Sequence, residues 1–213
     1  MRLYLFRHGL SEANIARRVT GTPEDPLSAQ GVNQARAMAP WIEAAAICPD
    51  RFLTSQWRRA QETARLLFPT AEWEIDPRLG ETDAGAVANA PLDSFLHDYP
   101  DFYSDYRNAY PGGESHATLN ERVLDWLHSL RVQGISDTAA SEIAVVSHSG
   151  PIACLLQQAL SIGMERFPAL LPAHASLTIL DWNVGSDLPV LRGFSLMPPE
   201  ALASMSMSSA RKG

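Results

Sequence analysis

The sequence predicts an α/β fold with three layers, in which helices cover both faces of a mostly parallel sheet that has one antiparallel edge strand. Two observations carry this prediction. Short β-rich runs alternate with longer segments of helical spacing, which is typical of strands joined by crossover helices. In addition, 46% of the 213 residues are hydrophobic and 19% are charged, which suits the core of one globular domain. We expect that domain to span residues 1–197.

Six short apolar runs are expected to form the strands of this sheet. The last run follows a short segment with turn composition, Asn183–Asp187, and is therefore predicted to be the antiparallel edge strand. Beyond it, residues 198–213 are rich in Ser, Met and Ala, which predicts a mobile tail. The six runs are 2–6, 51–54, 73–76, 142–147, 175–182 and 189–196.

Five segments between these runs have the spacing of helices. Ser28 can cap a helix over Ala29–Ala46, and Pro40 is expected to kink or split that helix. A Thr118-x-x-Glu121 capping box is expected to open a later one. The remaining helices are predicted at Trp57–Phe68, Leu92–Tyr106, Thr118–Leu130 and Pro151–Leu160.

The charge composition excludes some classes of partner. The net charge is −7, and Lys212 is the single lysine among seventeen basic residues. An acidic chain repels polyanions, so we expect no nucleic-acid partner, and an anionic substrate would have to be captured by a local group of arginines. The first apolar run is too short for a signal peptide or a membrane span, which predicts a cytoplasmic protein with no membrane partner. Cys48 and Cys154 lie in apolar segments and are expected to be buried thiols.

Two histidines follow predicted strands in the same way. Arg7-His8-Gly9 ends the first strand, and Ser147-His148-Ser149-Gly150 ends the fourth predicted run. Ligands of parallel sheets bind beyond the carboxyl ends of the strands, so His8 and His148 are expected to converge although 140 residues separate them. Nearby helix N-termini would add backbone N–H groups that point at an anion. The sequence therefore predicts an anion site at this edge of the sheet.

Three further segments are predicted to reach the same edge. The segment 54–60 leads a strand into a helix and contains Arg59, and the loop 79–85 contains carboxylates, among them Glu81. Ser11 and Asn14 follow His8 within one short turn and could donate hydrogen bonds to an oxygen. A phosphoryl group in transfer spreads negative charge over three oxygens, so these donors suit phosphoryl transfer.

The residue types suggest a mechanism without a metal or a cofactor. His8 would attack phosphorus through an unprotonated ring nitrogen, with its tautomer fixed by a hydrogen bond from the other nitrogen. The product would be a phosphohistidine. Glu81 would protonate the leaving oxygen and then activate water.

Six segments together resemble the histidine phosphatase superfamily, which includes the phosphoglycerate mutases. Each segment alone is a weak signal, but they occur in the order of the family and span residues 1–150. They are Arg7-His8-Gly9-Leu10-Ser11-x-x-Asn14, Gly21-Thr22 through Pro26-Leu27-Ser28-x-x-Gly31, Arg59-Ala60-x-x-Thr63-Ala64, Leu79-x-Glu81 with Gly85, Pro111-Gly112-Gly113-Glu114-Ser115, and Val146-Ser147-His148.

The resemblance implies a phosphoglycerate mutase-like fold and a role for each matching residue. His8 would be the nucleophile, Glu81 the proton donor, and Arg7, Arg59 and His148 the phosphate pocket. The further phosphate or substrate contacts implied are Ser11, Asn14, Gly21, Thr22 and Ser149.

The chain also departs from the family pattern. Leu10 stands where many relatives carry a polar residue, Gln56-Trp57 where many have Pro-Leu, and Ser149 where the first of two glycines is usual. The long basic insertions typical of phosphoglycerate mutases are not visible after Glu81, which favours a phosphatase over a mutase.

Three functions are therefore compared. The leading hypothesis is a metal-independent phosphomonoesterase that hydrolyses small phosphorylated metabolites through phospho-His8. The alternatives are a phosphoglycerate mutase and, with less support, a catalytically idle regulator that binds phosphorylated ligands. The sequence predicts neither the substrate nor the oligomeric state.

Some side chains have two interpretations. The segment 84–116 is interpreted either as a cap that selects an apolar or aromatic leaving group, or as ordinary helix packing, because 95–110 holds four of the five tyrosines. His174 precedes a strand and receives no role. Arg17 and Arg18 are interpreted either as an extension of the phosphate site or, preferably, as part of a solvated helix face. The other residues expected at the solvent-facing surface are Arg58, His97, His116 and His128.

Overall fold

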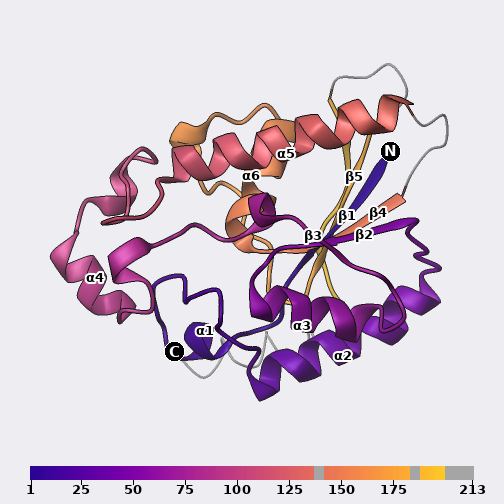
Figure 1. Cartoon of the computed structure of the whole chain (residues 1–213), viewed down its shortest axis with the longest axis horizontal. Coiled ribbons are helices and arrows are strands. Elements are labelled where there is room, and N and C mark those ends of the chain that lie inside the picture. Colours follow the sequence, from indigo (N-terminus) through magenta and orange to yellow (C-terminus); the bar gives the residue numbers. More distant parts are fainter. Residues whose placement is uncertain (137–141, 183–187, 200–213) are drawn as a thin grey trace.

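The computed structural model describes residues 1–136, 142–182 and 188–199 of the chain. A six-stranded sheet lies between two helical layers (Figure 1). Helices α5 (His116–Ser136) and α6 (Ser149–Ala159) cover one face, and α2 (Ala29–Ala44) and α3 (Arg58–Leu67) cover the other. The three-layer α/β/α fold predicted from the sequence is thus confirmed.

The strands are ordered β3-β2-β4-β1-β5-β6 across the sheet. The first four of these are parallel to their neighbours, β5 is antiparallel to β1, and the edge strand β6 is antiparallel to β5 as predicted. The sequence left the direction of β5 unassigned, and this strand proves important for the site. The strand bounds are β1 Arg2–Arg7, β2 Arg51–Thr54, β3 Glu74–Ile75, β4 Glu142–Ser147, β5 Leu177–Asp181 and β6 Val190–Leu196.

Short helices complete the described part of the chain. Two are α-helices, α1 (Glu12–Ile15) and α4 (Leu92–Asp98), and α4 lies to one side of the layered body (Figure 1). The others are single 3₁₀ turns at η1 Pro77–Leu79, η2 Gly85–Val87, η3 Phe102–Ser104 and η4 Met164–Arg166.

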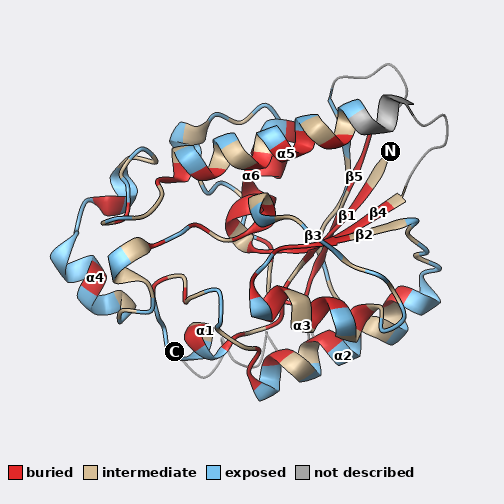
Figure 2. Ribbon diagram, in the orientation of Figure 1, coloured by how far each residue is buried: buried red, intermediate tan, exposed pale blue. Residues whose placement is uncertain are grey.

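Side chains of β1 point alternately into two cores, as the pleat of a strand requires. Leu3 and Leu5 belong to the core under α5 and α6, whereas Tyr4 and Phe6 belong to the core under α2 and α3. Burial on both faces explains why the central strands are almost continuously apolar. Figure 2 shows the buried residues concentrated on the sheet and on the inward faces of the helices.

Several predicted helix bounds are wrong for local reasons. The helix expected over Leu92–Tyr106 ends at Asp98, because Pro100 lacks an N–H and disfavours helical geometry at the residue before it. The capping box at Thr118 is absent. Instead the Ser115 hydroxyl accepts a hydrogen bond from the Thr118 backbone N–H at 3.1 Å, so the helix starts one turn earlier.

Two other expectations need correction. Pro40 lies inside α2 without splitting it. Cys48 is exposed in the loop after α2, so only Cys154 is the buried thiol that was expected. The turn predicted at Asn183–Asp187 lies outside the described residues, as do residues 200–213 of the predicted tail.

Candidate active site

The two histidines meet at the carboxyl edge of the sheet, as predicted. Parallel pairing places Arg7 opposite Ser147, so the next residues, His8 and His148, leave the sheet side by side. Their ring centroids lie 4.9 Å apart with an interplanar angle of 61°. Both side chains are buried. The pairing of β1 with β4 therefore brings His8 and His148 together although they are far apart in the sequence.

His8 is held in one tautomer by its own loop. Its Nδ1 lies 2.6 Å from the carbonyl oxygen of Gly9, which can only accept, so Nδ1 carries the proton. The Nε2 atom accepts from Arg59 Nε at 3.1 Å and is therefore the basic nitrogen. Burial, followed by the charges of Arg59, His148 and Arg7, holds the His8 pKa well below its usual value. The ring is neutral at neutral pH, with a nucleophilic lone pair on Nε2.

Arg59 lies at the start of α3 and is completely enclosed by polar partners and one ring. Its NH1 contacts Asp25 Oδ2 at 3.2 Å, and its NH2 donates to the Thr20 carbonyl at 2.9 Å. The guanidinium carbon lies 4.3 Å from the centroid of the Trp57 ring, a cation–π contact. These contacts fix the guanidinium beside His8. Its neighbour Arg58 is exposed and pairs with Glu62, as the sequence predicted for a solvent-facing arginine.

Arg7 supplies a second guanidinium, which is partly buried, and His174 holds it. NH1 donates to the Pro172 carbonyl at 2.6 Å, and NH2 lies 2.8 Å from Nε2 of His174. Arginine can only donate, so this Nε2 is an acceptor. Burial lowers the His174 pKa to about 3, helped by the positive charges of Arg7 and Arg59, so its ring is neutral. Burial also lowers the Arg7 pKa, to about 10.

His148 is oriented from behind by Ser55. Its Nε2 lies 2.7 Å from the Ser55 hydroxyl, and the Trp57 ring packs edge-on against it at 5.3 Å. Among the described residues, Nδ1 of His148 has no hydrogen-bond partner although it is buried. If the Ser55 hydroxyl donates to Nε2, Nδ1 carries the proton and is a free donor beside His8. Burial and the charges of Arg59 and Arg7 keep the His148 pKa well below its usual value.

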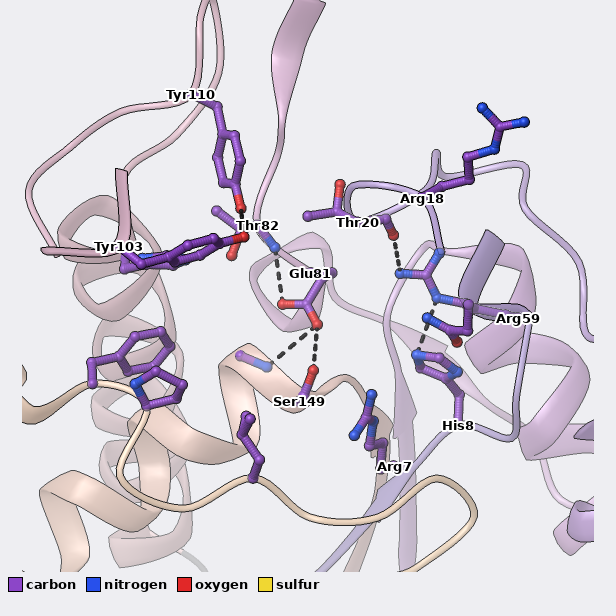
Figure 3. Close-up of a pocket in the computed structure, with 16 residues that line it drawn as sticks. Arg7, His8, Arg18, Thr20, Arg59, Glu81, Thr82, Tyr103, Tyr110 and Ser149 are labelled. Atoms are coloured by element: carbon purple, nitrogen blue, oxygen red, sulfur yellow. Dashed lines mark hydrogen bonds between the residues drawn. The ribbon is translucent and has the colours of Figure 1, made fainter. Parts of the chain in front are cut away.

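Glu81 lies on the other side of the cavity from His8 and Arg59 (Figure 3). Its carboxylate rests on the N-terminus of α6, where it accepts from the Ser149 hydroxyl at 3.0 Å and from the Gly150 backbone at 3.3 Å. A Cβ on Gly150 would overlap Oε1 of this carboxylate, so a larger residue there would displace the Glu81 side chain. Ser149, one of the departures from the family pattern, thus contacts the acid through its side chain.

The loop that carries Glu81 is fastened to α5 by one arginine. Arg122 donates to the backbone carbonyls of Arg78, Gly80 and Glu81 at 2.8, 2.9 and 2.9 Å. Glu114 binds the same guanidinium at 2.7 and 2.8 Å, and this pair is mostly buried. Glu81 is therefore positioned from both ends, by α6 at its carboxylate and by α5 at its backbone.

These side chains surround a cavity of about 240 Å³. Six of the ten predicted site residues line this cavity: Arg7, His8, Asn14, Arg59, Glu81 and Ser149. The other four do not line it: His148, Ser11, Gly21 and Thr22. Ser11 instead caps α1, because its hydroxyl accepts from the Asn14 backbone at 3.2 Å. The lining residues are Arg7, His8, Asn14, Arg18, Thr20, Arg59, Glu81, Thr82, Tyr103, Tyr110, His116, Ser149, Gly150, Phe167, Pro168 and Leu171.

Several lining or supporting residues were not predicted. His116 was expected at the surface but is buried against Phe167. Arg18, also assigned to the surface, is exposed and lines the cavity mouth. His174 and Asp25, which hold the two arginines, received no role. Strand and helix patterns carry no signal for such contacts. The position of His174, three residues before β5, would indicate its proximity to the end of β1 only if the direction of β5 were known.

The described residues contain no group of metal ligands and no membrane-spanning helix. Within residues 1–136, 142–182 and 188–199, no three His, Cys, Asp or Glu side chains are grouped so that they could hold a metal ion. None of the helices in these ranges is both long and apolar enough to span a membrane.

Comparison with solved structures returns phosphatases of the same shape. The α-ribazole phosphatase from Shigella flexneri superposes with a TM-score of 0.81 at 25% identity, covering 92% of this chain and 96% of that one. A mycobacterial glucosyl-3-phosphoglycerate phosphatase in complex with VO3 gives a TM-score of 0.78 at 27% identity, covering 91% and 98% of the two chains.

Sequence comparison returns a mutase and bifunctional enzymes. The protein named probable phosphoglycerate mutase GpmB of Yersinia pestis (strain Pestoides F) is 30% identical over 190 residues, 86% of each chain. Human 6-phosphofructo-2-kinase/fructose-2,6-bisphosphatase 1 is 30% identical over 184 residues, 83% of this chain and 36% of that protein. This chain thus spans little more than a third of the bifunctional relatives.

The family itself follows from a match over most of the chain. The profile of the histidine phosphatase superfamily (branch 1) matches residues 3–192, which include both histidines, Arg7, Arg59 and Glu81. The order of the six motifs, the shape of the fold and the convergence of His8 and His148 agree with this match. The chain belongs to the histidine phosphatase superfamily.

Proposed function

We propose that this protein is a phosphomonoesterase that hydrolyses small phosphorylated metabolites through a phosphohistidine on His8. One observation carries the proposal: the basic Nε2 of His8 faces the buried Arg59 guanidinium, with Glu81 on the opposite side of the cavity. A nucleophile, a positive pocket and an acid in that order suit in-line phosphoryl transfer.

In the first step, the Nε2 lone pair attacks phosphorus and the bond to the ester oxygen breaks. Glu81, in its acid form, gives its proton to that oxygen, which leaves as an alcohol. His8 then carries the phosphoryl group on Nε2, while Nδ1 keeps its proton and donates it in a hydrogen bond to the Gly9 carbonyl. The positive charge that develops on the ring is stabilised by this hydrogen bond.

In the second step, water attacks the phosphoryl group and gives a proton to the Glu81 carboxylate. The bond between phosphorus and nitrogen breaks, its electron pair returns to Nε2, and inorganic phosphate is released. The acid is then protonated again and His8 is neutral, so both groups are ready for another cycle.

Three fixed donors would neutralise the charge on the phosphoryl oxygens. Arg59 would exchange its contact with His8 Nε2 for an oxygen, and Arg7 would offer its guanidinium from the end of β1. The unpartnered Nδ1 of His148 would supply the third donor. Because Asp25, His174 and Ser55 already orient these groups, little reorganisation is needed during the reaction.

The decisive variant is His8→Ala. It should abolish release of phosphate from 4-nitrophenyl phosphate and remove the acid-labile phosphoryl label that the wild type acquires in a rapid quench. His128→Ala is the matched control, because His128 is exposed on α5 far from the cavity lining. Phosphate release by His8→Ala at the wild-type rate would refute the proposal.

A mutase is the second candidate, favoured by the GpmB relative. It would begin with the same phosphohistidine and return the phosphoryl group to another hydroxyl. A coupled assay with 3-phosphoglycerate and measurement of free phosphate separates the two functions. Isomerisation that outpaces phosphate release would replace the proposed hydrolase with a mutase. Turnover of either kind would exclude an idle regulator.

A further inference from the structure

The part of the cavity beyond Glu81 has a wall of aromatic and apolar side chains. Tyr103 and His116 are stacked at 6.0 Å with an interplanar angle of 20°, and His116 packs on Phe167 at 4.8 Å. Pro168 and Leu171 extend this surface along the cavity. We call these five residues the aromatic wall: Tyr103, His116, Phe167, Pro168 and Leu171.

The aromatic wall is uncharged at neutral pH. Burial lowers the His116 pKa, so that its ring is neutral. The Tyr103 hydroxyl is 3.2 Å from that of Tyr110, and burial raises the pKa of Tyr110, so the Tyr110 phenol keeps its proton. Nothing on this wall would neutralise a carboxylate or a second phosphate of a substrate.

The other charged lining residues belong to the reaction centre or lie away from the wall. Arg7, Arg59 and Glu81 surround His8. Arg18 is exposed, its NH1 lies 3.5 Å from the Asn89 carbonyl, and Figure 3 shows its guanidinium pointing away from Glu81.

Part of this apolar surface is still exposed. Tyr103 is 51% exposed and Leu171 is 54% exposed, although both line the cavity. Three other aromatic residues of the segment, Phe95, Phe102 and Tyr110, pack in a small core of their own. The segment 84–116 therefore combines the two interpretations made from the sequence: it packs as a small core and also lines the cavity.

We infer that the leaving group of the substrate is an uncharged ring, aromatic or cyclic and apolar, which packs against Tyr103, Phe167 and Leu171. This inference rests on the proposed phosphomonoesterase activity. The leaving oxygen would sit at Glu81, and the ring would continue from it along the aromatic wall. Such packing removes apolar surface of both partners from water.

Three alkyl phosphates test this inference, because their leaving alcohols have similar intrinsic reactivity and differ mainly in the group that would contact the wall. Each releases a primary alcohol: 2-phenylethyl phosphate, ethyl phosphate and 3-phosphonooxypropanoate. We expect kcat/KM to be about tenfold higher for the phenylethyl ester than for the ethyl ester, which is the scale of one good aromatic contact. The carboxylated ester should be the slowest.

Two substitutions locate the preference on the aromatic wall. Tyr103→Ala and Leu171→Ser should each lower the ratio of kcat/KM for the phenylethyl and ethyl esters toward one. Leu160→Ser is the matched control, because Leu160 is an equally apolar exposed leucine that does not line the cavity. It should keep the wild-type ratio.

The outcomes separate this inference from the function on which it rests. Release of phosphate at equal kcat/KM from the phenylethyl and ethyl esters would overturn the inference and leave the phosphatase intact. A preference for the carboxylated ester that disappears in Arg18→Gln would also overturn it, in favour of an acidic leaving group. No turnover of any of the three esters, nor of 4-nitrophenyl phosphate, would overturn the proposed function and the inference together.

Discussion

The two sides of the cavity are built in opposite ways. Around His8, the charged groups have intramolecular partners that fix their orientation, such as Asp25 for Arg59 and His174 for Arg7. Along the aromatic wall, Tyr103 and Leu171 leave half of their surface exposed. A reaction centre needs its dipoles set in advance, whereas a leaving-group site gains affinity from surface that is still free to be covered. On the proposed function, the residues at the strand ends would carry the chemistry, and the segments that form the aromatic wall would set the specificity.

Arg59→Lys should lower the activity more than the other substitutions, because it keeps the positive charge but removes the fixed geometry of the guanidinium. Lysine cannot contact His8, Asp25 and the Thr20 carbonyl at once. We expect kcat/KM for 4-nitrophenyl phosphate to fall about 1000-fold, the scale for loss of one preorganised donor. Steady-state kinetics would check this.

Arg58→Lys is the neighbouring control, since Arg58 is exposed and pairs with Glu62. It should retain wild-type kinetics. If Arg59→Lys lost less than about tenfold, charge alone would suffice, and the preorganisation argued for this side of the cavity would be wrong.

The neutral histidines of the reaction centre should make the protein sensitive to acid. The pKa of His174 is lowered to about 3, and those of His8 and His148 lie well below the usual value. The unfolded chain therefore binds protons below about pH 6.5 that the folded chain does not. Stability is fully present above that pH and falls as the pH falls. For His174, whose pKa is about 3, the loss between pH 6.5 and pH 5 is about 2 kcal/mol.

Urea unfolding at pH 7 and pH 5 measures this loss. His174→Asn removes one titrating ring and retains an acceptor for Arg7, so its loss of stability should be smaller than that of the wild type by about 2 kcal/mol. His128→Asn, at an exposed position on α5, should follow the wild type. An identical loss in His174→Asn and the wild type would show that His174 does not stay neutral in the folded protein.

Trp57→Leu should have the smallest effect, because it removes a support rather than a contact with substrate. The Trp57 ring lies under the Arg59 guanidinium and against the His148 edge. Loss of a cation–π contact of about 1 kcal/mol corresponds to roughly a fivefold lower kcat. Trp57→Phe should recover most of the rate, whereas a merely structural role would leave kcat unchanged in both variants once they are folded. Equal kcat in Trp57→Leu and the wild type would show that Trp57 does not help to position Arg59 and His148.

The fold and the core of the site could be predicted from the sequence because they depend on strand ends. His8, His148, Arg59 and Glu81 each follow a short apolar run, and parallel strands bring such residues to one edge. His174 escaped prediction for the converse reason. Strand β5 is antiparallel to β1, so the residues before β5 meet the residues after β1, as the hydrogen bond from Ala175 to the His8 carbonyl shows.

The specificity side was less predictable because it depends on irregular chain. His116 looked like a surface residue beside a helix, and only the fold of residues 84–116 encloses it. The contact of the Ser149 hydroxyl with Glu81 was also beyond prediction, because the loop 79–85 and helix α6 meet only in the tertiary structure. Patterns of hydrophobicity carry no information about such meetings.

Helix α5 also acts as a spacer. His116, in its first turn, belongs to the aromatic wall, and Arg122, less than two turns later, holds the backbone of the Glu81 loop. A ligand that displaces the wall through His116 would therefore carry the proposed proton donor with it. Two residues six positions apart on one helix thus set the spacing between His116 of the wall and the backbone of the Glu81 loop.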